Sequence, residues 1–147
     1  MVTIEIDGGA SVNKSAQYLI PLVLLASTAA GGAEGFRATE VMKGAVTIRG
    51  QSIRYPATAN PEVTAMLVEL APGGASDRHQ HPIPPYIQVL QGTLTVEFDD
   101  GSRQSFEAGR GFLEAVDTWH TARNLGEDPV KFLVVFMGEQ GKSNFMR

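Results

Sequence analysis

The sequence of 147 residues contains no cysteine, and this absence excludes several kinds of chemistry together. Without cysteine there are no disulfide bonds, no thiolate metal ligands and no cysteine nucleophile. Lysine and arginine are also few, 12 against 16 acidic residues, and they never form a run. A chain with net charge −4 and no basic cluster lacks the surface that a phosphate backbone requires. We therefore expect no nucleic-acid partner.

Long apolar runs are missing as well. The longest is Tyr18–Ala26, which is too short for a membrane-spanning helix of roughly 20 residues. Small residues follow it at positions 27–32, a pattern typical of a cleaved export signal. The acidic residues at positions 5 and 7 do not suit such a signal, but a true start at Val12 would leave Lys14 close to a positive amino terminus. We predict that residues 1–35 are an export signal and leader of a periplasmic or secreted protein. If they are instead a helix of the mature chain, the protein is cytoplasmic.

Glycine and proline are abundant, with 16 and 8 residues, and they separate short apolar runs. This distribution predicts an all-β domain with many turns, of the sandwich or barrel kind. We expect nine or ten short strands, a tether over 36–44, a single barrel over 45–137 and a polar C-terminal tail over 138–147. The expected strands lie over 45–49, 52–55, 63–70, 86–91, 93–98, 103–106, 111–116, 119–124 and 130–136.

Strict alternation marks the segment 93–98. Leu94, Val96 and Phe98 fall on one face of the expected strand, and threonine and glutamate fall on the other. The first set is predicted to be buried, and Glu97 to be solvated.

The three histidines are the candidate metal ligands. His79 and His81 are two positions apart, so in an extended chain both side chains point to one face, with Cα atoms about 7 Å apart. His120 belongs to another expected strand and can join them only through the fold. Three neutral imidazoles bind a first-row divalent ion and leave coordination positions open. A His-x-His pair alone is weak evidence, because most histidines are ordinary surface or core residues.

The spacing around these histidines strengthens the prediction. Residues 73–92 read G-x5-H-x-H-x10-G, and residues 109–124 read G-x10-H-x3-N. These stretches resemble the two sequence motifs of the cupin family. The resemblance implies a double-stranded β-helix, or jelly-roll, barrel with the three histidines as metal ligands. It also implies a homodimer, with the hairpin over 46–55 at the interface.

Two departures from the family pattern bear on the chemistry. Pro85 stands where the first motif has a glutamate ligand, and Ala115 and Asp117 replace a proline and a glycine of the second. Without that carboxylate the ion would keep its full charge, which favours an anionic small-molecule ligand. Glu114 is the best candidate for a replacement carboxylate, although acidic side chains are exposed in most cases.

Tyr86 and Gln88 are further candidates for the site, since they begin the strand after the His-x-His segment and could contact a bound ligand. They are equally well explained as ordinary strand residues. The sequence has no phosphate-binding loop, nucleophile elbow or HExxH motif.

These features lead to one preferred hypothesis and three alternatives. The preferred function is a metal-dependent small-molecule enzyme of dioxygenase-like chemistry, with Fe(II) favoured over Mn, Ni, Zn or Cu. A non-catalytic module that binds or senses a small ligand or metal is the first alternative, and a cupin lyase or isomerase is the second. A barrel without metal that serves only for oligomerisation is the third.

Overall fold

The computed structural model describes residues 35–147. The chain divides into two units, Met1–Arg37 and Ala38–Arg147. The strands described below all belong to the second unit. Residues 1–34 of the predicted export signal, with the alternative start at Val12, lie outside the described range. The predicted tether has no regular secondary structure and is mostly exposed over residues 38–44.

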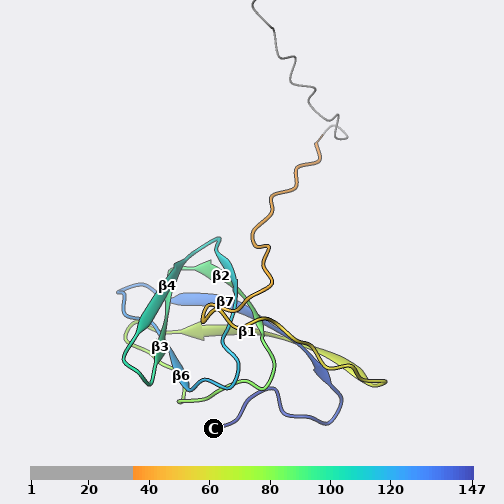
Figure 1. Cartoon of the computed structure of the whole chain (residues 1–147). Coiled ribbons are helices and arrows are strands. Elements are labelled where there is room, and N and C mark those ends of the chain that lie inside the picture. Colours follow the sequence, from red (N-terminus) through yellow and green to blue (C-terminus); the bar gives the residue numbers. More distant parts are fainter. Residues whose placement is uncertain (1–34) are drawn as a thin grey trace, which may run out of the picture. The chain divides into compact units, whose positions relative to one another are not determined.

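Seven strands form two antiparallel sheets that face each other (Figure 1). The larger sheet has the order β1-β7-β2-β5 and the smaller the order β4-β3-β6. The strands are β1 Pro61–Leu70, β2 Tyr86–Gln91, β3 Thr93–Phe98, β4 Arg103–Glu107, β5 Gly111–Leu113, β6 His120–Arg123 and β7 Val130–Glu139. The all-β prediction is confirmed. The expected number of nine or ten strands is too high for the part of the chain described. No helix within residues 35–147 is long and apolar enough to cross a membrane.

The two missing strands are those predicted over 45–55. This segment is an irregular hairpin with a single bridge between Val46 and Ser52. Its polar groups bond outward to the barrel: the Ile48 N–H donates to the Leu113 carbonyl at 2.8 Å, and the Gln51 side chain donates to the Val116 carbonyl at 2.7 Å. Within the hairpin the Thr47 N–H donates to the Gln51 carbonyl at 2.9 Å, and the Ile53 N–H donates to the Ala45 carbonyl at 3.0 Å. With a single bridge, these bonds do not make two regular strands.

β5 ends three residues earlier than predicted, because the chain turns after Leu113. Asp117 lies in this turn with φ of 47°, the left-handed region that glycine adopts most easily. Its N–H donates to the carbonyl of His81 at 2.8 Å. Asp117 thus takes a backbone conformation that suits glycine, the residue of the family pattern at this position.

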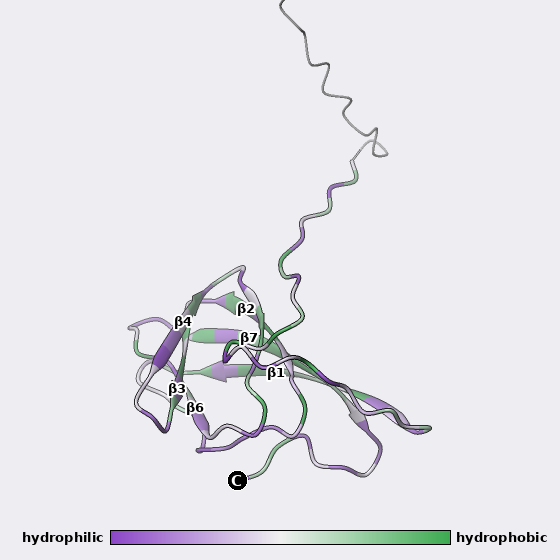
Figure 2. Ribbon diagram, in the orientation of Figure 1, coloured by the Kyte–Doolittle hydropathy of each residue, from purple (hydrophilic) through white to green (hydrophobic). Residues whose placement is uncertain are grey.

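The core lies between the two sheets and follows the period of two. Alternate residues of β7, beginning with Val130, are buried, and Figure 2 shows the corresponding mixture of hydrophobic and hydrophilic positions along the strands. Leu94, Val96 and Phe98 of β3 are buried, as predicted. Gly92, between β2 and β3, has φ of 73°, and a Cβ there would lie 2.9 Å from the Pro129 carbonyl oxygen. Only glycine fits this close connection between the two sheets.

Candidate metal centre

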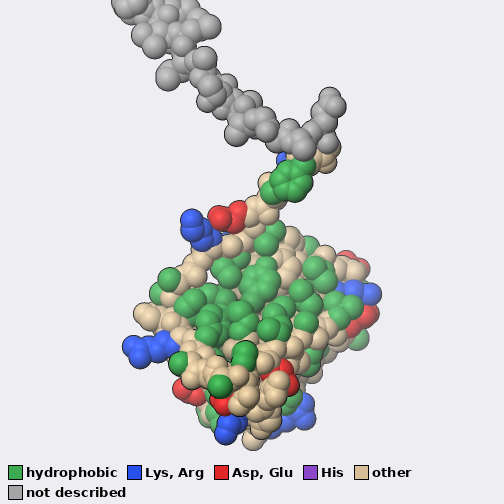
Figure 3. All heavy atoms as spheres, turned by 90° about the vertical axis from the view of Figure 1, so that its right-hand side faces the viewer, with side chains coloured by type: hydrophobic (Ala, Val, Ile, Leu, Met, Phe, Trp, Pro, Cys, Tyr) green, Lys and Arg blue, Asp and Glu red, His purple; other side chains and the backbone are tan. Residues whose placement is uncertain are grey.

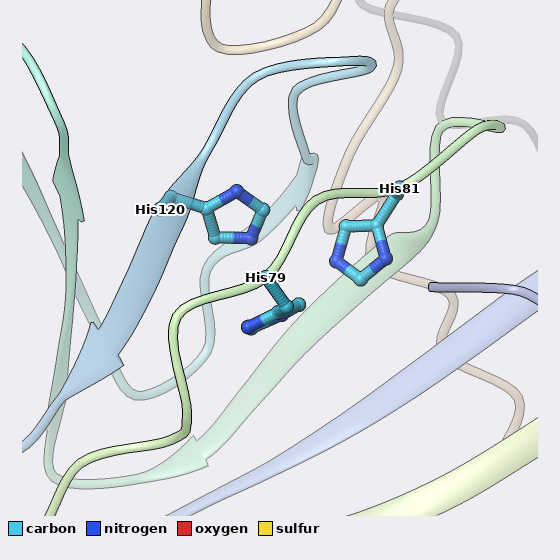
Figure 4. A group of neighbouring side chains, drawn as sticks. All are labelled: His79, His81 and His120. Carbon is cyan, nitrogen blue, oxygen red and sulfur yellow. The ribbon is translucent and has the colours of Figure 1, made fainter. Parts of the chain in front are cut away.

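Two segments distant in sequence meet at one end of the barrel. His79 and His81 lie in the connection between β1 and β2, and His120 is the first residue of β6. His79 and His120 exchange two backbone hydrogen bonds, each of 2.9 Å, which hold the two segments together. The three rings point toward one another (Figure 4), with centroids 4.5–5.1 Å apart. One nitrogen from each ring lies within 4.8 Å of the others, so the group can hold a metal ion.

The second nitrogen of each ring is bonded to a backbone carbonyl. His79 Nδ1 contacts the Asp77 oxygen at 2.8 Å, and His120 Nδ1 contacts the Thr118 oxygen at 2.8 Å. His81 Nδ1 contacts the Asn144 oxygen at 3.0 Å. A carbonyl can only accept, so each Nδ1 carries the proton and each Nε2 presents a free lone pair. Metal-binding histidines are oriented in this way.

The inner nitrogens have the environment that a metal site requires. His81 Nε2 and His120 Nε2 are buried and have no hydrogen-bond partner within the described residues. Buried polar atoms without a partner are rare, and an ion is one of the groups that accounts for them. The geometry therefore fits a divalent metal held by these histidines.

Glu114 is the fourth polar group at this point. It follows β5 directly, and its side chain is only 7% exposed. Its Oε2 lies 3.2 Å from His81 Nε2, and its Oε1 lies 3.3 Å from His120 Nε2. Of the three additional candidates from the sequence, the structure places Glu114 alone against the histidines.

The electrostatics of the site favour an ionised Glu114 carboxylate and a neutral His79 imidazole. Burial opposes ionisation of Glu114, but its close contacts with His81 and His120 outweigh burial and lower the pKa of this carboxyl. Burial, with smaller contributions from His120 and His81, lowers the pKa of His79 against the opposing effect of its hydrogen bond to Asp77. Both shifts favour the charge states in which these groups bind metal.

A cavity of about 230 Å³ opens beside the histidines. Its walls are mostly apolar, and Ser76, Asp77 and Arg147 contribute polar groups. The apolar lining residues are Met66, Val68, Ile87, Leu94, Ala122, Phe132, Val134, Phe136 and Phe145. His79, His81 and Glu114 also line the cavity, so a bound molecule would lie against the site and be enclosed mostly by hydrocarbon.

Tyr86 and Gln88 do not line the cavity. The Tyr86 hydroxyl donates to the Gln88 side-chain oxygen, and both groups lie close to Gly111 of β5. Ile87, between them, faces the cavity instead, as strand alternation requires. The structure thus places these two candidates among ordinary strand residues.

Sequence reasoning missed the contribution of the C-terminal segment. The Asn144 carbonyl orients His81, Met146 pairs with Gln80, and Phe145 lines the cavity. β7 also continues to Glu139, past the predicted end of the barrel at residue 137. The decisive group is a backbone carbonyl, which no side-chain pattern records, so the sequence held no signal for it.

The fold and the site define a small β-barrel protein with a three-histidine group that can hold a divalent metal. A family model described as "Cupin domain" matches residues 66–136, which include all three histidines. This match supports membership of the cupin superfamily.

Several solved structures are similar to part of this chain. An uncharacterized conserved protein with a double-stranded β-helix domain from Klebsiella pneumoniae is 20% identical with a TM-score of 0.50, and the match covers 64% of this chain and 88% of that one. The oxalate decarboxylase of Lactobacillus farciminis is 26% identical with a TM-score of 0.48, over 57% of this chain. This chain spans only 26% of the length of that enzyme. No curated protein matches the chain.

Proposed function

We propose that this cupin is a metal-dependent enzyme of dioxygenase-like chemistry that acts on a small, mostly apolar molecule, with Fe(II) as the favoured ion. The observation that carries the proposal is the group of three histidines, with one nitrogen of each ring within 4.8 Å of the others, beside a mostly apolar cavity. A redox-active divalent ion, when bound, supplies the electron transfer that oxygen chemistry requires.

The remaining contributions come from the chain itself. The histidines hold the ion in a fixed orientation, because each Nδ1 is tied to a backbone carbonyl. Phenylalanine and aliphatic side chains exclude water and bind the apolar part of the substrate. The cavity, about 230 Å³, is smaller than the roughly 300–1,000 Å³ of sites for drug-sized ligands, which favours a compact substrate. Arg147, among the lining residues, provides a positive charge for an anionic group on the substrate.

The composition of the lining favours oxygen chemistry over a lyase or isomerase reaction. Proton abstraction needs a base within hydrogen-bond reach of the substrate. Apart from the histidines, the acidic or basic lining residues are Asp77, Glu114 and Arg147. Asp77 is 74% exposed at its side chain and lies 3.7 Å from Arg147, and Glu114 contacts two of the histidines. None of these is a free base inside the cavity.

The test is oxygen uptake by the iron-loaded protein with small anionic thiols, diketones and phenols. We expect steady uptake with at least one class, and none after His79→Ala or His120→Ala. The matched control is Arg123→Lys, since Arg123, the last residue of β6, pairs with Glu97 at 3.3 Å and does not line the cavity. Iron binding without oxygen consumption or any transformed product across the panel would refute the enzyme proposal and favour the non-catalytic binding module.

We also propose that the protein is a homodimer. One face of the barrel is largely apolar, with charged side chains around the apolar area (Figure 3), as is typical of subunit interfaces. Val63 and Leu67 of β1 are 67% and 68% exposed, and Val46 of the predicted interface hairpin is 52% exposed. Light scattering should give twice the mass of one chain, and Leu67→Lys should reduce the measured mass to that of a single chain. A wild-type monomer at micromolar concentration would refute the dimer.

We further propose that residues 1–35 direct export of the protein. Mass spectrometry that finds residues 18–26 on the protein from its native cell would refute this export signal.

A further inference from the structure

We infer that Glu114 is a fourth ligand of the metal, supplied by the end of β5 rather than by the His-x-His segment. The inference rests on the metal site of the proposed function, and it assigns a carboxylate to a site otherwise made of neutral imidazoles. The geometry carries it: one carboxylate oxygen lies near His81 Nε2 and the other near His120 Nε2, at 3.2 and 3.3 Å.

The contact between Glu114 and the two histidines is not an ordinary hydrogen-bonded pair. Each Nδ1 already carries its ring's proton, so both Nε2 atoms present lone pairs to the carboxylate. Two lone pairs and a carboxylate repel one another unless something positive lies among them. Neither Nε2 has a hydrogen-bond partner within residues 35–147. A cation shared by these groups satisfies all of them at once.

Burial makes an unused carboxylate at this position costly. The Glu114 side chain is 7% exposed, and its neighbours His81 and His120 are 4% and 0% exposed. Buried acidic residues are almost always paired or bound to metal. No lysine or arginine forms an ion pair with Glu114 among the described residues. The histidines, or an ion that they share, are therefore the groups that can compensate its charge.

The strand register explains how Glu114 reaches the site. Tyr86 of β2 is paired with Leu113 of β5, and the Glu114 N–H donates to the Pro85 carbonyl at 3.0 Å. Residues opposite each other in an antiparallel pair direct their side chains to the same side of the sheet. Glu114 therefore projects to the side on which a side chain at position 85 would lie, and Pro85 has no polar group to offer there.

A fourth, anionic ligand changes the charge of the site. With three imidazoles alone a divalent ion keeps its full charge of +2. With Glu114 the charge of the ion and its ligands falls to +1, which reduces the preference of the site for an anionic substrate. The expectation of an anionic ligand, which rested on neutral ligands only, is weakened accordingly.

The experiment measures Co(II) binding to the full-length protein, by titration and by visible absorption, because the Co(II) spectrum reports coordination directly. Glu114→Gln should weaken Co(II) binding by about tenfold or more, since even outer partners of metal ligands contribute roughly 10–100-fold. It should also change the shape and intensity of the Co(II) absorption bands. Glu114→Asp should retain the charge and give an intermediate affinity.

Two controls separate the possible outcomes. Glu97→Gln removes a carboxylate that pairs with Arg103 and Arg123 away from the site, and it should leave the affinity and the spectrum unchanged. His79→Ala should abolish binding. If Glu114→Gln and Glu114→Asp both bind Co(II) within twofold of the wild type, with the same spectrum, the inference is wrong while the three-histidine site stands. If the wild-type protein itself binds no Co(II), the proposed metal site fails and the inference fails with it.

Discussion

Asn124 offers the sharpest test of how the site's framework is stabilised. Its side chain is 1% exposed and makes three hydrogen bonds. Nδ2 donates to the Leu70 carbonyl at 3.1 Å and to the Asp128 carbonyl at 2.8 Å, and Oδ1 accepts from the Gly126 N–H at 3.0 Å. One amide thus joins the end of β1 to the loop between β6 and β7. We expect Asn124 to act through stability and not through the metal.

The expected cost of removing this amide follows from those contacts. A hydrogen bond contributes roughly 0.5–1.5 kcal/mol net, and a buried carbonyl left without a partner costs about 1–3 kcal/mol. Asn124→Ala removes all three bonds and leaves the buried Leu70 carbonyl without its side-chain donor. The free energy of unfolding should therefore fall by about 2–4 kcal/mol, or roughly 10–20 °C in melting temperature for a domain of this size.

The assay is equilibrium urea unfolding of the metal-free protein, with Asn124→Asp as the matched variant. Asp keeps the acceptor but loses both donors, and it sets a negative charge against two carbonyls. It should be at least as unstable as Asn124→Ala, while both variants bind Co(II) with wild-type affinity once folded. An Asn124→Asp protein as stable as the wild type would refute the reasoning, because it would mean that the two donated bonds contribute nothing.

Three further predictions test other parts of the structure. The variant Glu114→Ala should bind Co(II) weakly, and adding Pro85→Glu to it should restore the affinity in a Co(II) titration, because position 85 lies opposite residue 114. Failure to regain affinity would contradict that register. Asp117→Ala should lose about 1 kcal/mol of unfolding free energy in thermal melts, whereas Asp117→Gly should lose none, because φ is positive at this turn. At the tip of the β3–β4 hairpin, hydrogen bonds from Ser102 lower the pKa of Asp100 from 3.8 to about 2. Any stability that this carboxylate contributes is therefore fully present above its ordinary pKa and is lost as pH falls through about 2. Ser102→Ala should bring its NMR titration midpoint back toward 3.8, and an unchanged midpoint would refute that cause.

Local pattern in the sequence was sufficient for the strands that form the barrel. β2 and β3 begin and end where alternation and the flanking turns predicted, because a strand buried on one face must repeat every two residues. The spacing of His79 and His81 likewise indicated that both rings share one face. The hairpin at 45–55 was predicted wrongly as two strands. Its apolar and polar alternation is real, but its hydrogen bonds are divided between the hairpin itself and the barrel, at β5 and the following loop.

Composition and spacing thus determined the class of fold, the absence of thiol chemistry and the three histidines that can share an ion. The tertiary structure alone decided that Glu114 faces them and that the Asn144 carbonyl orients one of them. The contacts of His81 with Glu114 and with Asn144 join residues far apart in the chain through sheet register and backbone position. Neither leaves a trace in a local pattern, because a period of two says which face a side chain takes but not what lies opposite it.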